Sequence, residues 1–244
     1  MCVVEWSAGR ASVRDAVELA VPISGAKLRD GYVAALRELT FGLAKFHSNS
    51  IVVGPVTLLH FGRTSVTRTS VEWPIEGGLL AGAPGGKWRI QSSAGRLEAT
   101  MTGFRPRLPR ALYAATHLQV HLLFVRLYLL RMRGREPANG LAAADADRVG
   151  AASVDIAFCL TLARLTGRRR VGRAVAVAAV YHTMCWSVWG RTLGGAVMRQ
   201  RVVAVDGSRP TPAQSLLRFA LLPMSWITRR PIHDEIAQTG VVQG

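Results

Sequence analysis

The spacing of apolar residues divides the chain into two regions of different character. Up to about residue 134, short runs rich in Val, Thr and aromatic residues alternate with Gly and Pro, which is typical of β-strands joined by turns. After about residue 147 the apolar residues gather into longer stretches. We therefore expect an α+β N-terminal domain, an antiparallel sheet with a long closing helix, followed by an all-α membrane domain of short apolar helices.

Within the first region the pattern predicts two helices among several strands. Apolar residues recur every three or four positions over Leu28–Phe46, which marks an amphipathic helix. A second, longer helix is predicted over Ala111–Met132, with His117, His121 and Arg126 interrupting its apolar face. Strands are expected at Val17–Ile23, Ile51–Phe61, Ser65–Ile75, Trp88–Gln91 and Leu97–Phe104, the last two as a hairpin. The Gly-rich segment Gly77–Gly86 is expected to be a loop.

The order of strand, helix, antiparallel strands and long closing helix resembles the helix-grip fold of the START-like ligand-binding superfamily. In that fold a curved sheet wraps the last helix around an apolar cavity, so the resemblance implies a hydrophobic ligand or lipid in the N-terminal domain. It covers residues 13–134 by topology, without a diagnostic motif. The alternative is a generic α+β domain whose core is filled by side chains.

Composition sets the domain limits. Residues 1–12 show no clear period and are expected to be an N-terminal arm, ahead of the α+β domain at 13–134. Charges followed by Pro137, Asn139 and Gly140 mark a linker at 135–146. Residues 147–244 then form the second domain.

The second domain contains three apolar stretches, Val149–Ala163, Ala174–Trp189 and Leu216–Ile227. A helix needs about 20 apolar residues to cross the hydrocarbon core of a bilayer, and each of these stretches is shorter. A short β-like run, Val202–Val205, ends in the turn pair Asp206-Gly207. Periodicity alone therefore leaves a buried helical domain and a membrane domain both open.

Four motifs in this domain occur in a fixed order. They are R-x-x-A-x-x-x-D at Arg148, Ala151 and Asp155; G-R-T-x-G at Gly190, Arg191, Thr192 and Gly194; R-V-V-x-x-D-G at Arg201–Gly207; and H-D-x-x-A-x-T at His233, Asp234, Ala237 and Thr239, preceded by Arg229 and Arg230. Together they resemble the RDD family of small polytopic membrane proteins over residues 147–242. The chain departs from the family pattern at Gly195, where the family has a lysine.

The resemblance implies a small integral protein of the cell membrane with a cytoplasmic N-terminal domain and a transport role such as ion exchange. The alternative is a membrane-anchored binding module whose N-terminal domain holds the hydrophobic ligand. We expect a functional polar set in the membrane domain at Arg148, Asp155, Arg191, Asp206, Arg218, His233 and Asp234. A purely structural role, fixing helix packing, is the other interpretation of this set.

A carboxylate in hydrocarbon needs a partner, so Asp155 is predicted to pair with Arg218 or Arg148. The alternative is that Asp155 caps the start of its helix at headgroup level. Two topologies remain open: three membrane passes, or short helices that dip into one leaflet and leave the arginines, including Arg168–Arg170, on the cytoplasmic side.

Charge and side-chain chemistry narrow the function classes. The net charge of +16 suits nucleic acid, anionic lipid headgroups or an acidic protein as a partner. With the resemblance to a membrane family, we expect the partner to be the lipid bilayer, and anionic lipids in particular. Aromatic residues do not interleave with the arginines, and no helix-turn-helix pattern occurs, so we expect no nucleic-acid binding. The sequence has no G-x-S-x-G motif, no paired carboxylates and no third ligand beside His117 and His121. We therefore expect no enzyme activity, no metal and no cofactor.

Overall fold

The computed structural model describes residues 2–135, 140–165 and 171–244. The chain divides into two compact units, Met1–Arg133 and Gly134–Gly244. Of the segment predicted as a linker, residues 136–139 lie outside the described residues, and a helix already begins at Asp145.

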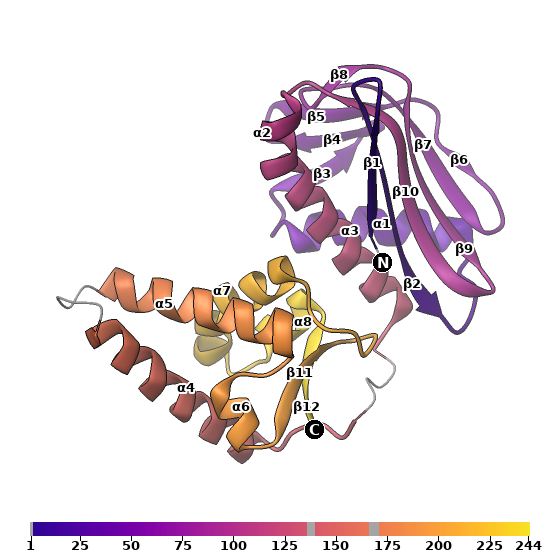
Figure 1. Ribbon diagram of the computed structural model, residues 1–244. Helices are drawn as coiled ribbons and strands as arrows, with labels where there is room; N and C mark the ends of the chain where they lie inside the picture. Colours follow the sequence, from indigo (N-terminus) through magenta and orange to yellow (C-terminus); the bar gives the residue numbers. More distant parts are fainter. Residues whose placement is uncertain (1, 136–139, 166–170) are drawn as a thin grey trace. The chain divides into compact units, whose positions relative to one another are not determined.

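The N-terminal unit is built on an antiparallel sheet, as predicted. Its strands are β1 (Val3–Ser7), β2 (Arg10–Leu19), β3 (Ala44–His47), β4 (Ser50–Val53), β5 (Val56–Phe61), β6 (Ser65–Val66), β7 (Ser70–Gly77), β8 (Ala81–Ala83), β9 (Gly86–Ser93) and β10 (Gly95–Pro106). Among the described residues they form one ten-stranded sheet in the order β1-β2-β10-β9-β7-β5-β4-β3, with β6 beside β7 and β8 beside β10 (Figure 1). The predicted hairpin is confirmed as β9 and β10.

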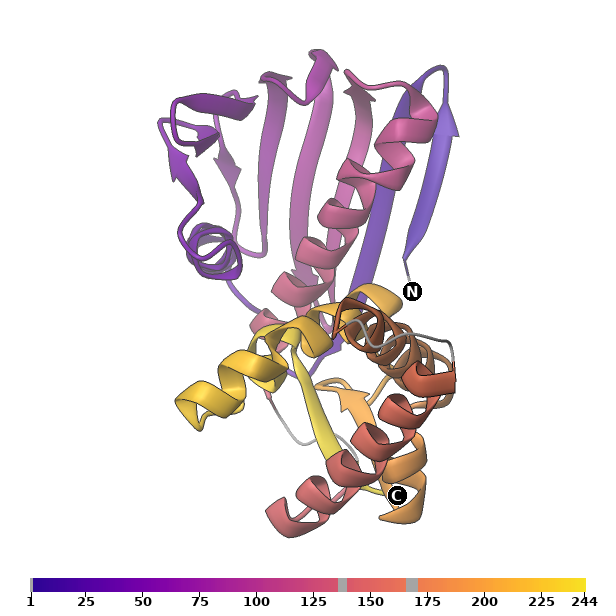
Figure 2. The ribbon, with the colours of Figure 1, turned by 90° about the vertical axis from the view of Figure 1, so that its left-hand side faces the viewer.

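Three helices accompany this sheet: α1 (Gly25–Leu39), α2 (Arg110–Ala115) and α3 (His117–Arg133). Figure 2 shows α3 lying across one face of the sheet. Strand β9 alternates buried and exposed residues along its length, which places Trp88 and Ile90 in the core. Tyr32 of α1 meets Trp73 of β7 at 5.0 Å between ring centroids and Tyr128 of α3 at 5.7 Å. Aromatic packing between the helices and the sheet therefore forms the centre of the unit.

Arg126, which interrupts the apolar face of α3, has an acidic partner on the sheet. Asp15 of β2 is buried, and its Oδ1 lies 4.0 Å from Nη1 of Arg126. The Asp15 carboxylate also accepts the backbone N–H of Ala16 at 2.9 Å. Because a buried charge is costly without an opposite charge and hydrogen bonds, these contacts account for Arg126 inside the helix.

Several predicted boundaries are wrong. The expected arm at 1–12 is largely strand, because Val3–Ser7 pairs with the beginning of β2. This edge strand has no fully buried residue, so it lacks the apolar alternation that would have revealed it. The helix predicted over Leu28–Phe46 ends at Leu39, because Phe41 and Gly42 have positive φ angles of 54° and 79°.

Two further segments differ from the predictions. The single long helix expected over Ala111–Met132 is divided into α2 and α3 at Thr116, whose backbone leaves the helical region at φ −122° and ψ −86°. The expected loop Gly77–Gly86 contains the short strand β8, which pairs with the end of β10.

The C-terminal unit combines helices with a small sheet. Its elements are α4 (Asp145–Leu165), α5 (Val171–Met184), the π-helical turn η1 (Cys185–Trp189), α6 (Leu193–Val197), β11 (Gln200–Ala204), α7 (Pro212–Thr228), α8 (Ile232–Ala237) and β12 (Thr239–Gln243). Strands β11 and β12 pair antiparallel, so the prediction of an all-α domain is wrong. Strand β11 pairs with β12, and the pattern of apolar residues does not predict β12.

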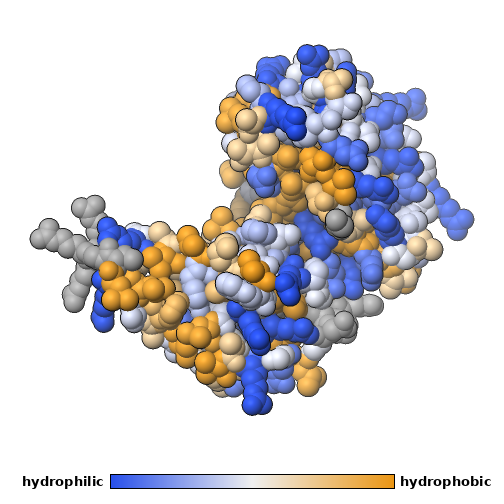
Figure 3. Space-filling model, viewed as in Figure 1, coloured by the Kyte–Doolittle hydropathy of each residue, from blue (hydrophilic) through white to orange (hydrophobic). Residues whose placement is uncertain are grey.

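Apolar side chains lie on the surface of this unit. Not one residue of α5, all of which the structure describes, is buried. Figure 3 shows hydrophobic residues gathered over the α4 and α5 region of the face in view. The exposed apolar residues of these two helices are Val149, Ile156, Leu160, Leu165, Val171, Val175, Val180 and Met184. No helix in the described part of the chain is both long enough and apolar enough to cross a membrane.

Candidate functional site

Asp234, in the first turn of α8, is the centre of a buried polar network in the C-terminal unit. It is 5% exposed and meets arginines from two other helices. Nη2 of Arg148, on α4, lies 2.6 Å from its Oδ2, and Nη1 of Arg218, on α7, contacts its Oδ1. Thr239 donates its hydroxyl to Oδ1 at 2.9 Å. These three partners together provide the opposite charges and hydrogen bonds that a buried carboxylate requires.

Arg218 is held at several points along its side chain. It is 3% exposed, donates from Nη1 to Oγ1 of Thr239 at 2.7 Å, and places its guanidinium 5.0 Å from the ring centre of Trp186. Its buried Nε has no hydrogen-bond partner among the described residues. The guanidinium is thus fixed in place with one N–H left over.

His233 adjoins the network through α7. Its Nδ1 lies 2.7 Å from Oγ of Ser225, which also accepts the backbone N–H of His233 at 3.0 Å. Its Nε2 lies 3.4 Å from Oδ2 of Asp234. Burial, followed by the charges of Arg218 and Arg148, lowers the pKa of His233 to about 3. The imidazole is therefore neutral at physiological pH, which keeps a further positive charge out of the cluster.

Asp155 belongs to a second polar set, and its predicted pairing with Arg218 or Arg148 is wrong. Both arginines pair with Asp234 instead. Oδ1 of Asp155 accepts the hydroxyl of Tyr181 and the backbone N–H of Gly194, each at 2.8 Å. The alternative, a cap at the start of its own helix, is wrong too, since α4 begins ten residues earlier at Asp145. Asp155 caps the first turn of another helix, α6.

The G-R-T-x-G motif is explained by the same junction. Gly190 ends the π-helical turn in a left-handed conformation, at φ 74°. Thr192 caps α6 by accepting the N–H of Gly195 at 3.1 Å. A Cβ on Gly194 would lie 2.0 Å from the carbonyl oxygen of Ala151, so only glycine lets α6 approach α4 this closely.

Arg191 and Asp206 occupy other positions. Arg191 is exposed between the π-helical turn and α6. Asp206 accepts the backbone N–H and the hydroxyl of Ser208 at 3.1 and 2.6 Å, and so stabilises the turn after β11. Of the seven predicted residues, direct contacts join Arg148, Arg218, His233 and Asp234, whereas Asp155 and Asp206 have separate local roles.

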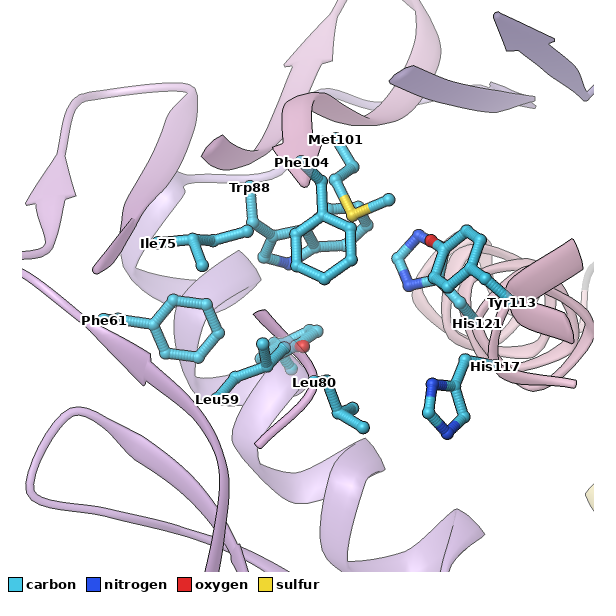
Figure 4. Close-up of a pocket in the computed structure, with 11 residues that line it drawn as sticks. Leu59, Phe61, Ile75, Leu80, Trp88, Met101, Phe104, Tyr113, His117 and His121 are labelled. Carbon is cyan, nitrogen blue, oxygen red and sulfur yellow. The ribbon is translucent and has the colours of Figure 1, made fainter. Parts of the chain in front are cut away.

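The N-terminal unit contains a cavity of about 70 Å³ between the sheet and the helices (Figure 4). It is lined by Tyr32, Leu59, Phe61, Ile75, Leu80, Trp88, Met101, Phe104, Tyr113, His117 and His121. Nε1 of Trp88 and Nε2 of His121 are buried there without a hydrogen-bond partner in the described structure. The two rings lie at 5.3 Å between centroids, edge to face. Two unsatisfied nitrogen atoms thus belong to residues that line a mainly apolar enclosure, to which Tyr32, Tyr113 and His117 add polar groups.

Burial alone lowers the pKa of His121 to about 4, so its ring is neutral at physiological pH. Its neighbour one helical turn earlier, His117, lines the same cavity. No group of three or more His, Cys, Asp or Glu side chains that could hold a metal ion occurs within the described residues. The cavity is therefore best described as a mainly apolar site with three nitrogen-bearing rings, those of Trp88, His117 and His121.

Several site residues were missed by the sequence reasoning. Tyr181 and Ser225 lie on helices whose apolar pattern gives no hint that their hydroxyls bind Asp155 and His233. Trp88 was assigned only to a strand. Thr239 did carry a signal, because it follows Asp234 at a fixed spacing within the H-D-x-x-A-x-T motif.

Comparison with known families identifies the C-terminal unit. Residues 173–239 match the model of the RDD family, from α5 to the first residue of β12. The match includes Arg191, Asp206, Arg218, His233 and Asp234, and it begins after α4, which carries Arg148 and Asp155. No curated protein and no solved structure gives a significant match. Over this segment the C-terminal unit is similar to the RDD family, whose domains are generally associated with membranes.

Proposed function

We propose that this protein is a membrane-attached binding module, in which the RDD domain holds the chain at the cell membrane and the cytoplasmic N-terminal unit binds a small, mainly apolar molecule. The observation that carries the binding function is the pair of unsatisfied nitrogens, Trp88 Nε1 and His121 Nε2, in the sheet–helix cavity. A buried polar atom without a partner costs about 1–3 kcal/mol, and a bound ligand that supplies the partner recovers that cost.

The walls of the cavity define the chemistry of the ligand. Phe61, Ile75 and Phe104 present only carbon atoms, and they suit an aromatic or aliphatic body. Trp88 Nε1–H is a donor and needs an acceptor. A carbonyl or hydroxyl group on a compact apolar skeleton meets these demands, whereas the cavity of about 70 Å³ is too small for a whole lipid chain.

Phenol, an aromatic ring with one hydroxyl, is a suitable probe. We expect it to bind the full-length protein in detergent, as measured by isothermal titration calorimetry, and to bind about tenfold more weakly to Trp88→Phe, which keeps an aromatic ring but removes the N–H. Trp73→Phe is the matched control, because Trp73 is equally buried on β7 but does not line the cavity. Equal loss of affinity in both variants would contradict the proposal.

Membrane attachment is supported by the apolar surface of α4 and α5. Contiguous apolar patches of this kind mark protein or membrane contacts. Trp189 and Trp226 are also exposed, and tryptophan favours the headgroup level of a bilayer. The apolar stretches in these helices are shorter than a bilayer crossing needs, which favours insertion into one leaflet. Recovery of the protein in the membrane pellet after an alkaline carbonate wash tests the attachment, and release into the supernatant would contradict it.

The orientation can be tested separately. Insertion into one leaflet leaves Arg168–Arg170 inaccessible from outside the cell; these residues lie outside the described part of the structure. A cysteine placed at Arg169 should resist an impermeant thiol reagent applied to intact cells. Labelling from outside would favour three membrane passes and exclude the one-leaflet arrangement.

The contacts around Asp234 favour a structural role for the polar set over ion exchange. Its carboxylate binds Arg148, Arg218 and Thr239 within the unit, so its oxygens are already occupied. A carboxylate that carried an ion or proton would need to release these partners in each cycle. The proposal therefore assigns binding, and not transport, as the function.

A further inference from the structure

The C-terminal unit contains a second, larger cavity, of about 690 Å³. Charge is distributed unevenly along its wall. In the described part of the chain, the lining includes six arginines against two aspartates: Arg148, Arg191, Arg201, Arg218, Arg229 and Arg230, with Asp145 and Asp155. The arginines come from α4, β11, α7 and the segments that follow η1 and α7. Residues far apart in the sequence thus give the cavity a strongly positive wall.

Two residues on this wall have buried donors without an acceptor in the part of the chain that the structure describes. Nε of Arg218 and Nε2 of Gln200 lack a hydrogen-bond partner among the described residues, and each residue is 3% exposed. Both atoms carry N–H groups, and the guanidinium can only donate. Buried polar groups are normally hydrogen-bonded, so unsatisfied donors in a positive cavity indicate a missing acceptor with negative charge.

The same cavity has an apolar side. Val149, Ile156, Leu222 and Trp226 also line it. An inorganic anion would leave these side chains without a partner, whereas a ligand with both an anionic group and a hydrocarbon part would cover both kinds of surface.

We propose that this cavity binds a phosphate group carried on an amphipathic molecule. A phosphate offers several acceptor oxygens, and arginine binds it in a two-pronged geometry that lysine cannot reproduce. Arg218 is already held by Asp234 and Trp186, so little conformational entropy is lost when its remaining N–H binds. The phosphate can come from a lipid headgroup or from a soluble phosphate, and the site is independent of the N-terminal cavity.

The experiment uses the full-length protein in detergent and on vesicles. Binding of inorganic phosphate is measured by calorimetry. Binding to phosphatidylcholine vesicles is measured by sedimentation, with either phosphatidic acid or phosphatidylserine added. Phosphatidic acid exposes a phosphate monoester, whereas phosphatidylserine supplies negative charge with an esterified phosphate. We expect the protein to prefer vesicles that contain phosphatidic acid. If inorganic phosphate also binds saturably, the site is open to soluble phosphates. If inorganic phosphate does not bind, the site is specific to the lipid headgroup.

Variants test whether this cavity is responsible. Arg229→Gln with Arg230→Gln removes two exposed lining charges, and Arg218→Lys keeps the buried charge while removing the Nε–H. Each should weaken phosphatidic acid binding about tenfold or more. Arg164→Gln, on the exposed end of α4 outside the lining, is the matched control and should leave it unchanged. Equal binding of phosphatidic acid and phosphatidylserine, or equal losses in Arg164→Gln and the lining variants, would overturn the proposal.

The result separates this inference from the proposed function. Failure of phosphate binding leaves the phenol titration and the carbonate wash unaffected. Release from the membrane in carbonate would exclude attachment, and phosphate binding in detergent would still be measurable.

Discussion

The N-terminal unit packs aromatic side chains into a buried core, whereas α5 of the C-terminal unit buries none of its residues. Trp73, Phe61 and Tyr128 are among the most deeply buried residues of the sheet–helix core. Val175 and Val180 of α5 are 53% and 64% exposed, while Arg218 and Asp234 are buried. The first distribution is that of a protein whose solvent is water. Both units bury charged groups, Asp15 in the first and Arg218 and Asp234 in the second, but only the second exposes hydrocarbon along a whole helix, as expected where the solvent is partly lipid.

The difference also concerns how buried polar groups are satisfied. The carboxylate of Asp234 has partners from three elements of its own unit. In the N-terminal cavity, Trp88 and His121 each bury a nitrogen without a partner in the described structure. Completed networks stabilise a fold, and incomplete ones indicate where a ligand can bind. The comparison therefore assigns a structural role to the Asp234 carboxylate, and binding to the atoms left without a partner among the described residues: Trp88 Nε1 and His121 Nε2 in one unit, and Arg218 Nε and Gln200 Nε2 in the other.

The largest effect is expected from breaking the network in the C-terminal unit. Asp234→Asn leaves Arg148 and Arg218 without their counter-charge, and loss of one partner from a buried ion pair costs about 3–5 kcal/mol. We expect a large decrease in the thermal stability of the full-length protein, measured in detergent by tryptophan fluorescence. Asp206→Asn, in the turn after β11, keeps an acceptor for Ser208 and should have a much smaller effect.

A second change distinguishes charge balance from simple loss of a contact. Adding Arg218→Met to Asp234→Asn removes the more deeply buried of the two unpaired charges and should recover part of the stability. If Asp234→Asn alone is as stable as the unchanged protein, the network is not the core of this unit, and the contrast between the units fails.

A smaller effect is expected from changing the surface of α5. A charged side chain at the centre of the hydrocarbon costs about 3 kcal/mol on insertion scales, so Val175→Glu with Val180→Glu should shift the protein into the carbonate supernatant. Stability in detergent should change little, because both side chains are exposed. Val66→Glu, an exposed valine of the N-terminal unit, is the control and should leave the protein in the membrane pellet. Retention of the double variant in the pellet would contradict lipid contact through α5.

Local patterns predicted much of the fold. Alternation predicted the β9–β10 hairpin, and long apolar stretches predicted the positions of α4, α5 and α7. Boundaries failed where a few residues changed direction, as at Phe41 and Thr116, because backbone angles at single residues leave no periodic signal. One boundary signal was present and missed: Thr211 and Gln214 form a capping box at the start of α7.

The sites could be predicted only in part. The family motifs drew attention to Arg148, Asp155 and Asp234, but they could not show that the arginines share Asp234, which is 86 residues from Arg148. Asp155 was paired with the wrong residues because charge suggested an arginine, whereas the structure uses a tyrosine and a backbone N–H. The cavity at Trp88 and His121 depends on contact between a strand and a helix, and no local spacing encodes it.

The smallest effect, a pH dependence, tests the burial of His121. Its pKa is lowered to about 4 in the folded chain, against about 6.5 when unfolded. Between these pH values His121 is protonated in the unfolded chain but not in the folded one, so the free energy of unfolding decreases as the pH falls. The stability contributed by neutral His121 is complete above about pH 6.5 and is lost toward pH 4, by about 1.4 kcal/mol per pH unit. We expect His121→Phe to reduce this slope in denaturant unfolding of the full-length protein at pH 7 and pH 4.5.

The matched control is His47→Phe, because His47 is exposed on β3 of the same sheet. Carboxylates also make the free energy of unfolding depend on pH, and they do so equally in every variant. The difference in pH dependence between His121→Phe and His47→Phe therefore reports the cavity histidine alone. Phenol should also stabilise the unchanged protein more than His121→Phe, since a ligand that binds only the folded state raises its stability by mass action. Identical pH slopes in the two variants would mean that His121 is hydrated in the folded state, and its Nε2 would then no longer indicate a ligand.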